Sequence, residues 1–168
     1  MAELRMLAPA ARFIFQGGPA ARRAAGDAFG VVLPEDACRA NAAGDRAVLW
    51  LGPEEHLLLA PVGDAQAIAT QLASALSGIA HSLVNVSQRQ VAVQVSGSDS
   101  SELLNSGCPL DLDPVAFPPG MCTRTLIGKA EAVLWRKAAA EYHLEVWRSF
   151  AGYVVDWLRE AGGSENRN

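Results

Sequence analysis

The sequence AVLWLGPEEHLLLA, residues 47–60, is the stretch that fixes the fold class. Two apolar runs flank a turn rich in glycine, proline and glutamate, and this pattern predicts a β-hairpin. The segment AVLW returns at residues 132–135, and a further predicted strand at 142–147 follows it. An amphipathic helix is predicted after each hairpin, starting near Asp64 and near Ser149. The chain therefore repeats a unit of strand, strand and helix.

Further elements are predicted around this repeat. A short helix is expected after Ser98 or Asp99, with Gly107 as a left-handed residue at its end, and a proline-rich loop follows it. The last helix is expected to place several large apolar side chains on one face. Hairpins that alternate with helices favour an α+β fold with a mainly antiparallel sheet, formed by two fused ferredoxin-like halves. Other strands are predicted at 29–33, 82–86, 90–95 and 124–127.

Composition sets the expected boundaries and the class of protein. The chain has 168 residues and is half apolar, which suits a single α+β domain, expected at 27–162, with a core that needs no metal or disulfide. Residues 1–26, rich in alanine, arginine and glycine, predict an irregular arm, and 163–168 a flexible tail. A net charge of −4 without a long basic run argues against nucleic acid as a partner. No apolar stretch approaches the length of about 18 residues that spans a bilayer, so we expect a cytoplasmic protein with no membrane partner.

Candidate catalytic groups are few. Cys38, Cys108 and Cys122 lack CxxC spacing, which predicts reduced thiols and no zinc site. No glycine-rich phosphate loop is present, so any nucleotide cofactor is expected on another chain. The three histidines fall in predicted strands. Asp111 and Asp113 suggest either a magnesium site or a rigid solvated turn, and the neighbouring prolines favour the turn. We expect no catalytic, cofactor-binding or metal-binding residue.

Aromatic and basic residues late in the chain are the best candidates for contact with another protein. Trp147-Arg148 combines an aromatic anchor with arginine, as interface hot spots do. An ordered proline-rich loop would lose little entropy on docking. For the arginines, a solvated surface role is the alternative. Self-association of the isolated chain would follow from such an apolar surface. The candidate interface residues are Trp147, Arg148, Phe150, Pro109, Phe117 and Arg124.

An ordered series of motifs resembles one family. The segments are LWLGPEEHLL at 49–58, VSQRQ at 86–90, GCPLDL at 107–112, FPPGMCTRTL at 117–126, GKA at 128–130 and WRSF at 147–150. In this order they resemble the gamma subunits of heterotetrameric sarcosine oxidase and, more distantly, the folate-binding domain of aminomethyltransferases. Gln88 departs from the family, which usually has histidine there, and this casts doubt on any role that needs imidazole at that position.

The resemblance implies an enzyme complex. In the family an alpha-type chain binds NAD and tetrahydrofolate, a beta-type chain carries FAD and FMN, and a delta-type chain binds zinc. The complex demethylates sarcosine oxidatively to glycine, with hydrogen peroxide and formaldehyde or 5,10-methylenetetrahydrofolate as further products. The gamma-type chain would contribute to assembly. Two alternatives are a folate-dependent aminomethyltransferase, for which the chain is short, and a stand-alone folate-binding or regulatory module.

Overall fold

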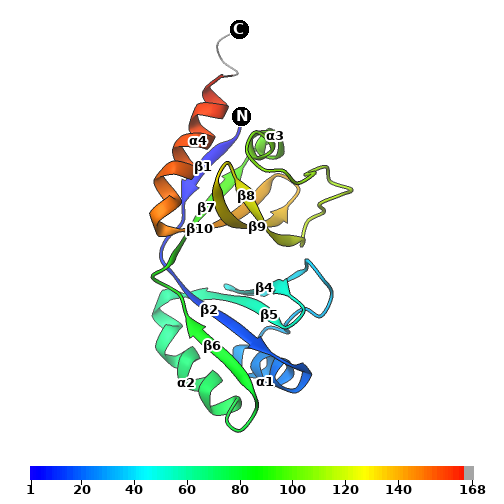
Figure 1. Ribbon diagram of the computed structural model, residues 1–168, viewed down its shortest axis with the longest axis vertical. Coiled ribbons are helices and arrows are strands. Elements are labelled where there is room, and N and C mark those ends of the chain that lie inside the picture. The colour runs from blue at the N-terminus through cyan, green and yellow to red at the C-terminus, as the bar shows by residue number, and fades with distance from the viewer. Residues whose placement is uncertain (165–168) are drawn as a thin grey trace. The chain divides into compact units, whose positions relative to one another are not determined.

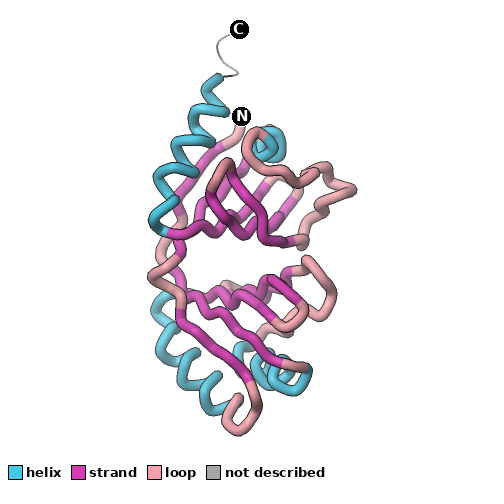
Figure 2. The backbone as a smooth tube through the Cα atoms, viewed as in Figure 1, coloured by secondary structure: helices cyan, strands magenta, loops and turns pink. Residues whose placement is uncertain are grey.

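The structure is a computed structural model that describes residues 1–164 (Figure 1). The chain forms two compact units. The first unit is Pro9–Gln88, and the second unit joins Met1–Ala8 to the chain from Arg89 onward. Each unit contains a five-stranded antiparallel sheet, and its helices pack on one face of that sheet (Figure 2). The expected α+β class is confirmed.

The first unit has the strand order β3-β4-β5-β2-β6. Its hydrophobic core lies between the sheet and two helices, with Phe13, Phe15 and Leu58 from strands and Ile68 and Leu72 from a helix. The elements are β2 (Ala10–Gly17), α1 (Pro19–Phe29), β3 (Ala40–Ala43), β4 (Arg46–Gly52), β5 (Glu55–Pro61), the 3-10 turn η1 (Val62–Asp64), α2 (Ala65–Ala75) and β6 (His81–Asn85). The predicted hairpin and the helix that follows it are confirmed.

The second unit has the strand order β1-β7-β10-β9-β8. Its core joins Val93, Leu134 and Leu144 of the sheet to Leu104 and Leu158 of the helices. The elements are β1 (Glu3–Met6), β7 (Gln90–Ser96), α3 (Ser100–Asn105), β8 (Cys122–Ile127), β9 (Ala130–Ala138), β10 (Glu141–Trp147), the 3-10 turn η2 (Arg148–Phe150) and α4 (Ala151–Ser164). The strands predicted here are confirmed, and the predicted cap Ser149 lies inside η2.

The repeat detected in the sequence is also seen in the lengths and order of the structural elements. The segment β5-η1-α2 matches β10-η2-α4 residue for residue, without insertion or deletion. Ile68 corresponds to Val154 and Leu72 to Leu158, and all four side chains are buried in the core of their own unit. Equivalent positions therefore perform the same packing role in both units.

β1 precedes β2 in sequence but lies in the sheet of the second unit, and β6 precedes β7 in sequence but lies in the sheet of the first. β1 pairs antiparallel with β7, where Leu4 lies opposite Val95, and β6 pairs with β2, where Leu83 lies opposite Phe15. Leu4 packs against the core of the second unit and Leu83 against that of the first. Each of these two edge strands therefore lies in a different sheet from the strand that follows it in sequence.

The prediction of an irregular arm at 1–26 is wrong. This segment contains β1, β2 and most of α1, and the expected domain start at residue 27 falls inside α1. Phe13 and Phe15 alternate toward the core, although Arg12 directly before them interrupts the apolar pattern. The break at Gly18-Pro19 is a helix start, because proline fits the first turn, where its missing N–H needs no partner.

Two further boundaries differ from the prediction. Residues 29–33 form no strand: α1 ends at Phe29, Gly30 closes it at φ +81°, and Val31 and Leu33 enter the core from an irregular segment. Buried apolar residues in a connection resemble a short strand in sequence. At the other end, α4 continues to Ser164, so the tail expected at 163–168 is wrong for its first two residues; 165–168 lie outside the described residues.

Candidate interaction surface

Four aromatic side chains near the end of the second unit are exposed to solvent. The exposed fractions are 43% for Trp147, 45% for Phe150 and 38% for both Tyr153 and Trp157. The other large apolar side chains that are exposed in the described part of the chain are aliphatic. The exposed aromatic side chains therefore lie in one segment, residues 147–157. Two of its residues, Trp147 and Phe150, are among the interface candidates predicted from the sequence.

α4 presents two different apolar faces. Val154 and Leu158 are fully buried against the sheet. Phe150, Tyr153 and Trp157 follow one another at spacings of three and four residues, and we call this exposed set the α4 stripe. The sequence predicts large apolar side chains on one face of this helix, and within that set the core takes only the valine and leucine positions.

Two glycines make room for the α4 stripe. The phenol oxygen of Tyr153 accepts a hydrogen bond of 3.1 Å from the backbone N–H of Lys129, and the Tyr153 and Trp157 rings lie 6.1 Å apart. A Cβ atom on Gly128 would lie 2.4 Å from the Tyr153 oxygen, and one on Gly107 2.6 Å from the Trp157 indole nitrogen. Gly107 is not left-handed as predicted; it is needed for this close approach.

Trp147 lies at the end of β10 and is covered on one side by an arginine. The guanidinium carbon of Arg89 is 5.2 Å from the centre of the Trp147 ring, a cation–π distance. The backbone N–H of Arg148 donates to the carbonyl of Arg89 at 2.8 Å, which joins the start of η2 to the residue before β7. The Trp147 and Arg148 side chains are exposed, as an interface role requires.

The proline-rich loop is ordered by a buried arginine. Arg136 of β9 donates hydrogen bonds to the carbonyls of Leu112 at 3.1 Å and Phe117 at 2.8 Å. Its guanidinium also stacks over Tyr142, 5.1 Å from the ring centre. Phe117 is only 2% exposed and belongs to the core, so it cannot be an interface anchor in this conformation.

The remaining candidate residues lie on separate elements. Pro109 is exposed in the loop after α3, and Arg124 is exposed on β8, an edge strand. Sequence reasoning missed Tyr153 and Trp157 as surface residues because helical spacing alone does not distinguish a core face from an exposed one. Comparison of the two repeats could have revealed them, since the matching helix α2 has no aromatic residue and α4 has two at positions that the fold does not require to be aromatic.

The carboxylates and thiols that could take part in catalysis or metal binding have structural roles here. A carboxylate oxygen of Asp111 accepts a hydrogen bond of 2.9 Å from the N–H of Asp113, and a carboxylate oxygen of Asp113 accepts one of 2.8 Å from the N–H of Val115. These bonds are those of a rigid turn, the alternative to a magnesium site that the prolines favoured. Within residues 1–164, no three His, Cys, Asp or Glu side chains cluster as metal ligands would. The three cysteines are free thiols, and Cys108 is buried in the core of the second unit.

The histidines lie in strands, as predicted. His56 of β5 is fully buried, and its Nε2 donates to the carbonyl of Pro34 at 2.7 Å. Burial lowers the pKa of His56, because the charged imidazolium loses its hydration. In β10, the Nε2 atom of His143 lies 2.7 Å from a carboxylate oxygen of Glu145. His81 opens β6 at the surface.

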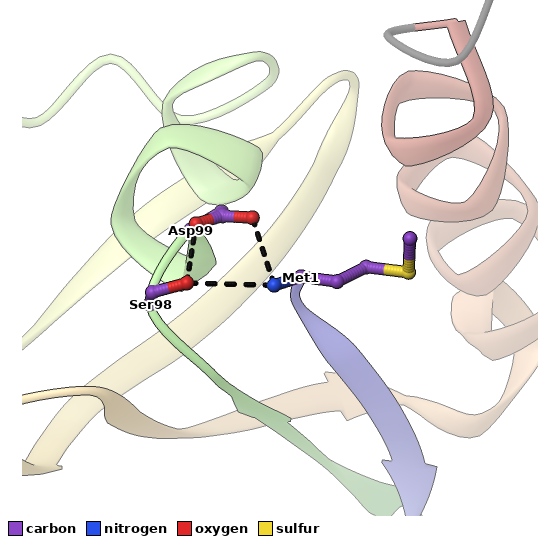
Figure 3. A network of polar contacts seen from close by, with 3 residues as sticks. All are labelled: Met1, Ser98 and Asp99. Carbon is purple, nitrogen blue, oxygen red and sulfur yellow. Dashed lines mark hydrogen bonds and ion pairs between the residues drawn. The ribbon is translucent and has the colours of Figure 1, made fainter.

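A pocket of about 470 Å³ lies among β1, α3 and the end of α4. Beside it, the amino group of Met1 contacts the carboxylate of Asp99 at 3.0 Å, and the hydroxyl of Ser98 donates to the same carboxylate (Figure 3). The Ser98 hydrogen bond, followed by the amino group, lowers the pKa of Asp99. The pocket is lined by both charged and apolar groups, including Glu102, Leu103, Leu158 and Arg159. No helix in the described part of the chain is long and apolar enough to cross a membrane.

Comparison with known proteins places these features in a family context. Residues 16–164 match the model of the "Sarcosine oxidase, gamma subunit family". Sarcosine oxidase subunit gamma from Arthrobacter sp. is 32% identical over 145 residues, covering 86% of this chain and 70% of that protein. The corresponding subunit from Corynebacterium sp. strain P-1 is 31% identical over 136 residues, covering 80% of this chain and 66% of that protein. This chain thus spans about two thirds of these relatives.

Solved structures give the same relationship. A chain of heterotetrameric sarcosine oxidase from Corynebacterium sp. U-96 has a TM-score of 0.91 at 27% identity, covering 97% of this chain and 84% of that chain. Aminomethyltransferase T of the Bartonella henselae glycine cleavage system has a TM-score of 0.66 at 14% identity, covering 94% of this chain and 45% of that chain. The second likeness concerns the fold alone.

Proposed function

The chain belongs to the sarcosine oxidase gamma subunit family, and from this membership we propose that it is the gamma-type subunit of a heterotetrameric sarcosine oxidase and acts in assembly. The observation that carries the proposal is the TM-score of 0.91 to a chain of such a heterotetramer, over 97% of this chain. The partners are alpha-type, beta-type and delta-type chains in the cytoplasm, with the alpha-type chain the main contact.

The chemistry of the complex is assigned to those partners. By family resemblance, NAD and tetrahydrofolate belong to the alpha-type chain, FAD and FMN to the beta-type chain and zinc to the delta-type chain. The complex would demethylate sarcosine to glycine. In this chain, Arg136, Asp111 and Asp113 hold nearby backbone groups, and these contacts support a structural role.

A stand-alone folate-binding module is the second candidate. It rests on the likeness to aminomethyltransferase T, which at 14% identity concerns the fold alone. An assembly subunit and a folate-binding module differ in what accompanies the purified protein. The subunit brings yellow, flavin-bearing chains, whereas the module brings a pterin and no other protein.

The test is affinity purification of the tagged chain from its native host and, separately, of the chain expressed alone. We expect the native preparation to contain flavin-bearing partners and to produce peroxide from sarcosine. We expect the chain expressed alone to show neither flavin absorbance nor peroxide production. Recovery from the host without partners but with a bound pterin would support the folate-binding module, and stoichiometric flavin on the isolated chain would contradict the assembly role.

A further inference from the structure

We propose that the α4 stripe, continued by Trp147, docks into an apolar groove on another protein chain of the complex, with a carboxylate at the groove's border. This inference rests on the proposed function and deepens it, because it names the surface and the chemistry of its partner. It is carried by a comparison between the two units, by the way the aromatic rings are held, and by their spacing.

The first unit shows what the fold itself requires of this helix face. Because the two segments match residue for residue, each position of the stripe has a counterpart that follows the same hairpin and turn. The positions equivalent to Phe150, Tyr153, Trp157 and Trp147 are Asp64, Ala67, Gln71 and Pro61. A unit of the same fold in the same chain therefore forms without an aromatic residue at any of them. The fold of a unit therefore does not account for the aromatic character of these positions, although Tyr153 and Trp157 also pack within the second unit.

Two of the three rings of the stripe are held in place before any partner binds. Tyr153 is fixed by its hydrogen bond to the backbone N–H of Lys129, and Trp157 lies against Gly107 and Gly128. Each of these two rings still exposes more than a third of its surface. Docking would bury that area while immobilising few additional side-chain torsions, which reduces the entropic penalty of association.

The spacing of the stripe matches one mode of protein recognition. Phe150, Tyr153 and Trp157 occupy positions i, i+3 and i+7, the pattern by which a helix places anchors in an apolar groove. The guanidinium of Arg89 over Trp147 places positive charge at its border, and Lys129, whose backbone N–H bonds to Tyr153, is an exposed residue. A carboxylate on the partner complements that charge.

The other flank of the stripe supplies a polar rim. Asp156, directly before Trp157, forms an exposed ion pair at 3.8 Å with Arg159, and Glu160 is also exposed. A hydrophobic centre surrounded by solvated charges is the usual anatomy of an interface between proteins. A similar chain of known structure belongs to a heterotetramer, and this favours a different chain over a second copy as the occupant.

The experiment transfers the surface of α2 onto α4. The triple variant Phe150→Asp, Tyr153→Ala and Trp157→Gln carries the residues of the equivalent positions in the first unit. The single variant Phe150→Asp accompanies it, because Phe150 is 45% exposed and makes no ring contact within residues 1–164, so it should fold normally. Val62→Asp, at a half-exposed position of η1 in the first unit, is the matched control.

Affinity for the partner chains is measured by titration, with circular dichroism of each variant as the check on folding. We expect Phe150→Asp to weaken binding about tenfold or more and the triple variant about a hundredfold, as loss of buried aromatic anchors does. Val62→Asp should bind within about twofold of the native chain. We expect Arg89→Glu with Lys129→Glu to weaken binding most at low salt, since exposed charges are screened at high salt.

Each outcome bears on a different part of the proposal. Native affinity of the folded Phe150→Asp and triple variants would overturn the docking surface while leaving the assembly role intact. Tighter binding after charge reversal would overturn the acidic border of the groove. Self-association of the native chain that the triple variant loses, without any change in partner binding, would show that a second copy occupies the stripe. If the native chain recruits no partner at all, the proposed function itself fails.

Discussion

The guanidinium group of Arg136 donates a hydrogen bond of 2.8 Å to the carbonyl of Phe117, which ties β9 to the proline-rich loop. Arg136→Met would leave this carbonyl and that of Leu112 without their donor, and an unpaired buried polar group costs about 1–3 kcal/mol. We expect the free energy of unfolding to fall by about 2–4 kcal/mol in urea denaturation. Lys137→Met, at the next and partly exposed position, should change it by less than about 0.5 kcal/mol. Equal effects would show that the loop does not depend on Arg136.

Gly128 permits the approach of Tyr153 as well as a left-handed backbone. Gly44 has nearly the same φ, +60° against +59°, but open space where a Cβ atom would be. Alanine at either position should cost about 1–2 kcal/mol for the left-handed conformation. We expect Gly128→Ala to be more destabilising than Gly44→Ala, because only its Cβ meets the Tyr153 oxygen. Tyr153→Phe, which removes that oxygen, should recover part of the difference in thermal melts; no recovery would contradict the steric explanation.

The buried His56 predicts a dependence of stability on pH. Burial lowers its pKa in the folded state below the ordinary value of 6.5, so the unfolded chain binds more protons as the pH falls below that value. The free energy of unfolding contributed by His56 is therefore complete above pH 6.5. It decreases as the pH falls from there to the folded-state pKa, by at most about 1.4 kcal/mol per pH unit.

The check is urea denaturation of His56→Gln between pH 7.5 and pH 5, values chosen because they bracket the ordinary histidine pKa of about 6.5. Glutamine retains a side-chain N–H for the carbonyl of Pro34 but does not titrate. We expect its stability to depend less on pH than that of the native chain. His81→Gln, at an exposed position, should retain the native dependence. The same slope for all three proteins would exclude His56 as its source.

Local patterns allowed much of the fold to be predicted, whereas long-range pairing did not follow from them. The hairpins and the helix at Ile68 and Leu72 are encoded within short windows by apolar spacing. β6 pairs with β2, which lies far away in sequence, and the apolar residues around Leu83 do not indicate to which of the two sheets the strand belongs. The strand β2 was missed because Arg12 interrupts its alternation.

Sequence patterns also gave an incomplete prediction of which candidate interface residues are exposed. Trp147 and Phe150 are exposed as expected, but Phe117 is buried, since its sequence surroundings of proline do not reveal the core behind them. Conversely, Tyr153 and Trp157 have the helical spacing of core residues and are partly exposed. Burial at such positions is decided by which side of the helix the sheet occupies. That information comes from the tertiary structure.

The pairing of β1 with β7 and of β6 with β2 predicts that a mutation in either edge strand loosens the sheet in which the strand pairs, and not the sheet of the strand that follows it in sequence. Leu4 of β1 packs on the core of the second unit, and Leu83 of β6 on that of the first. Both are partly buried, so replacement by alanine should cost about 1–2 kcal/mol, less than the 2–5 kcal/mol of a fully buried leucine.

Hydrogen exchange of backbone amides locates each effect. We expect Leu4→Ala to speed exchange in β7 and β10 while β2 and β5 keep their protection, and Leu83→Ala to give the reverse pattern, because each strand supports the sheet it pairs with. The two variants are controls for each other, since the same side chain is removed from equivalent strands. If Leu4→Ala instead speeds exchange only in β2 and β5, β1 stabilises the sheet of the strand that follows it in sequence, and the pairing of β1 with β7 is contradicted.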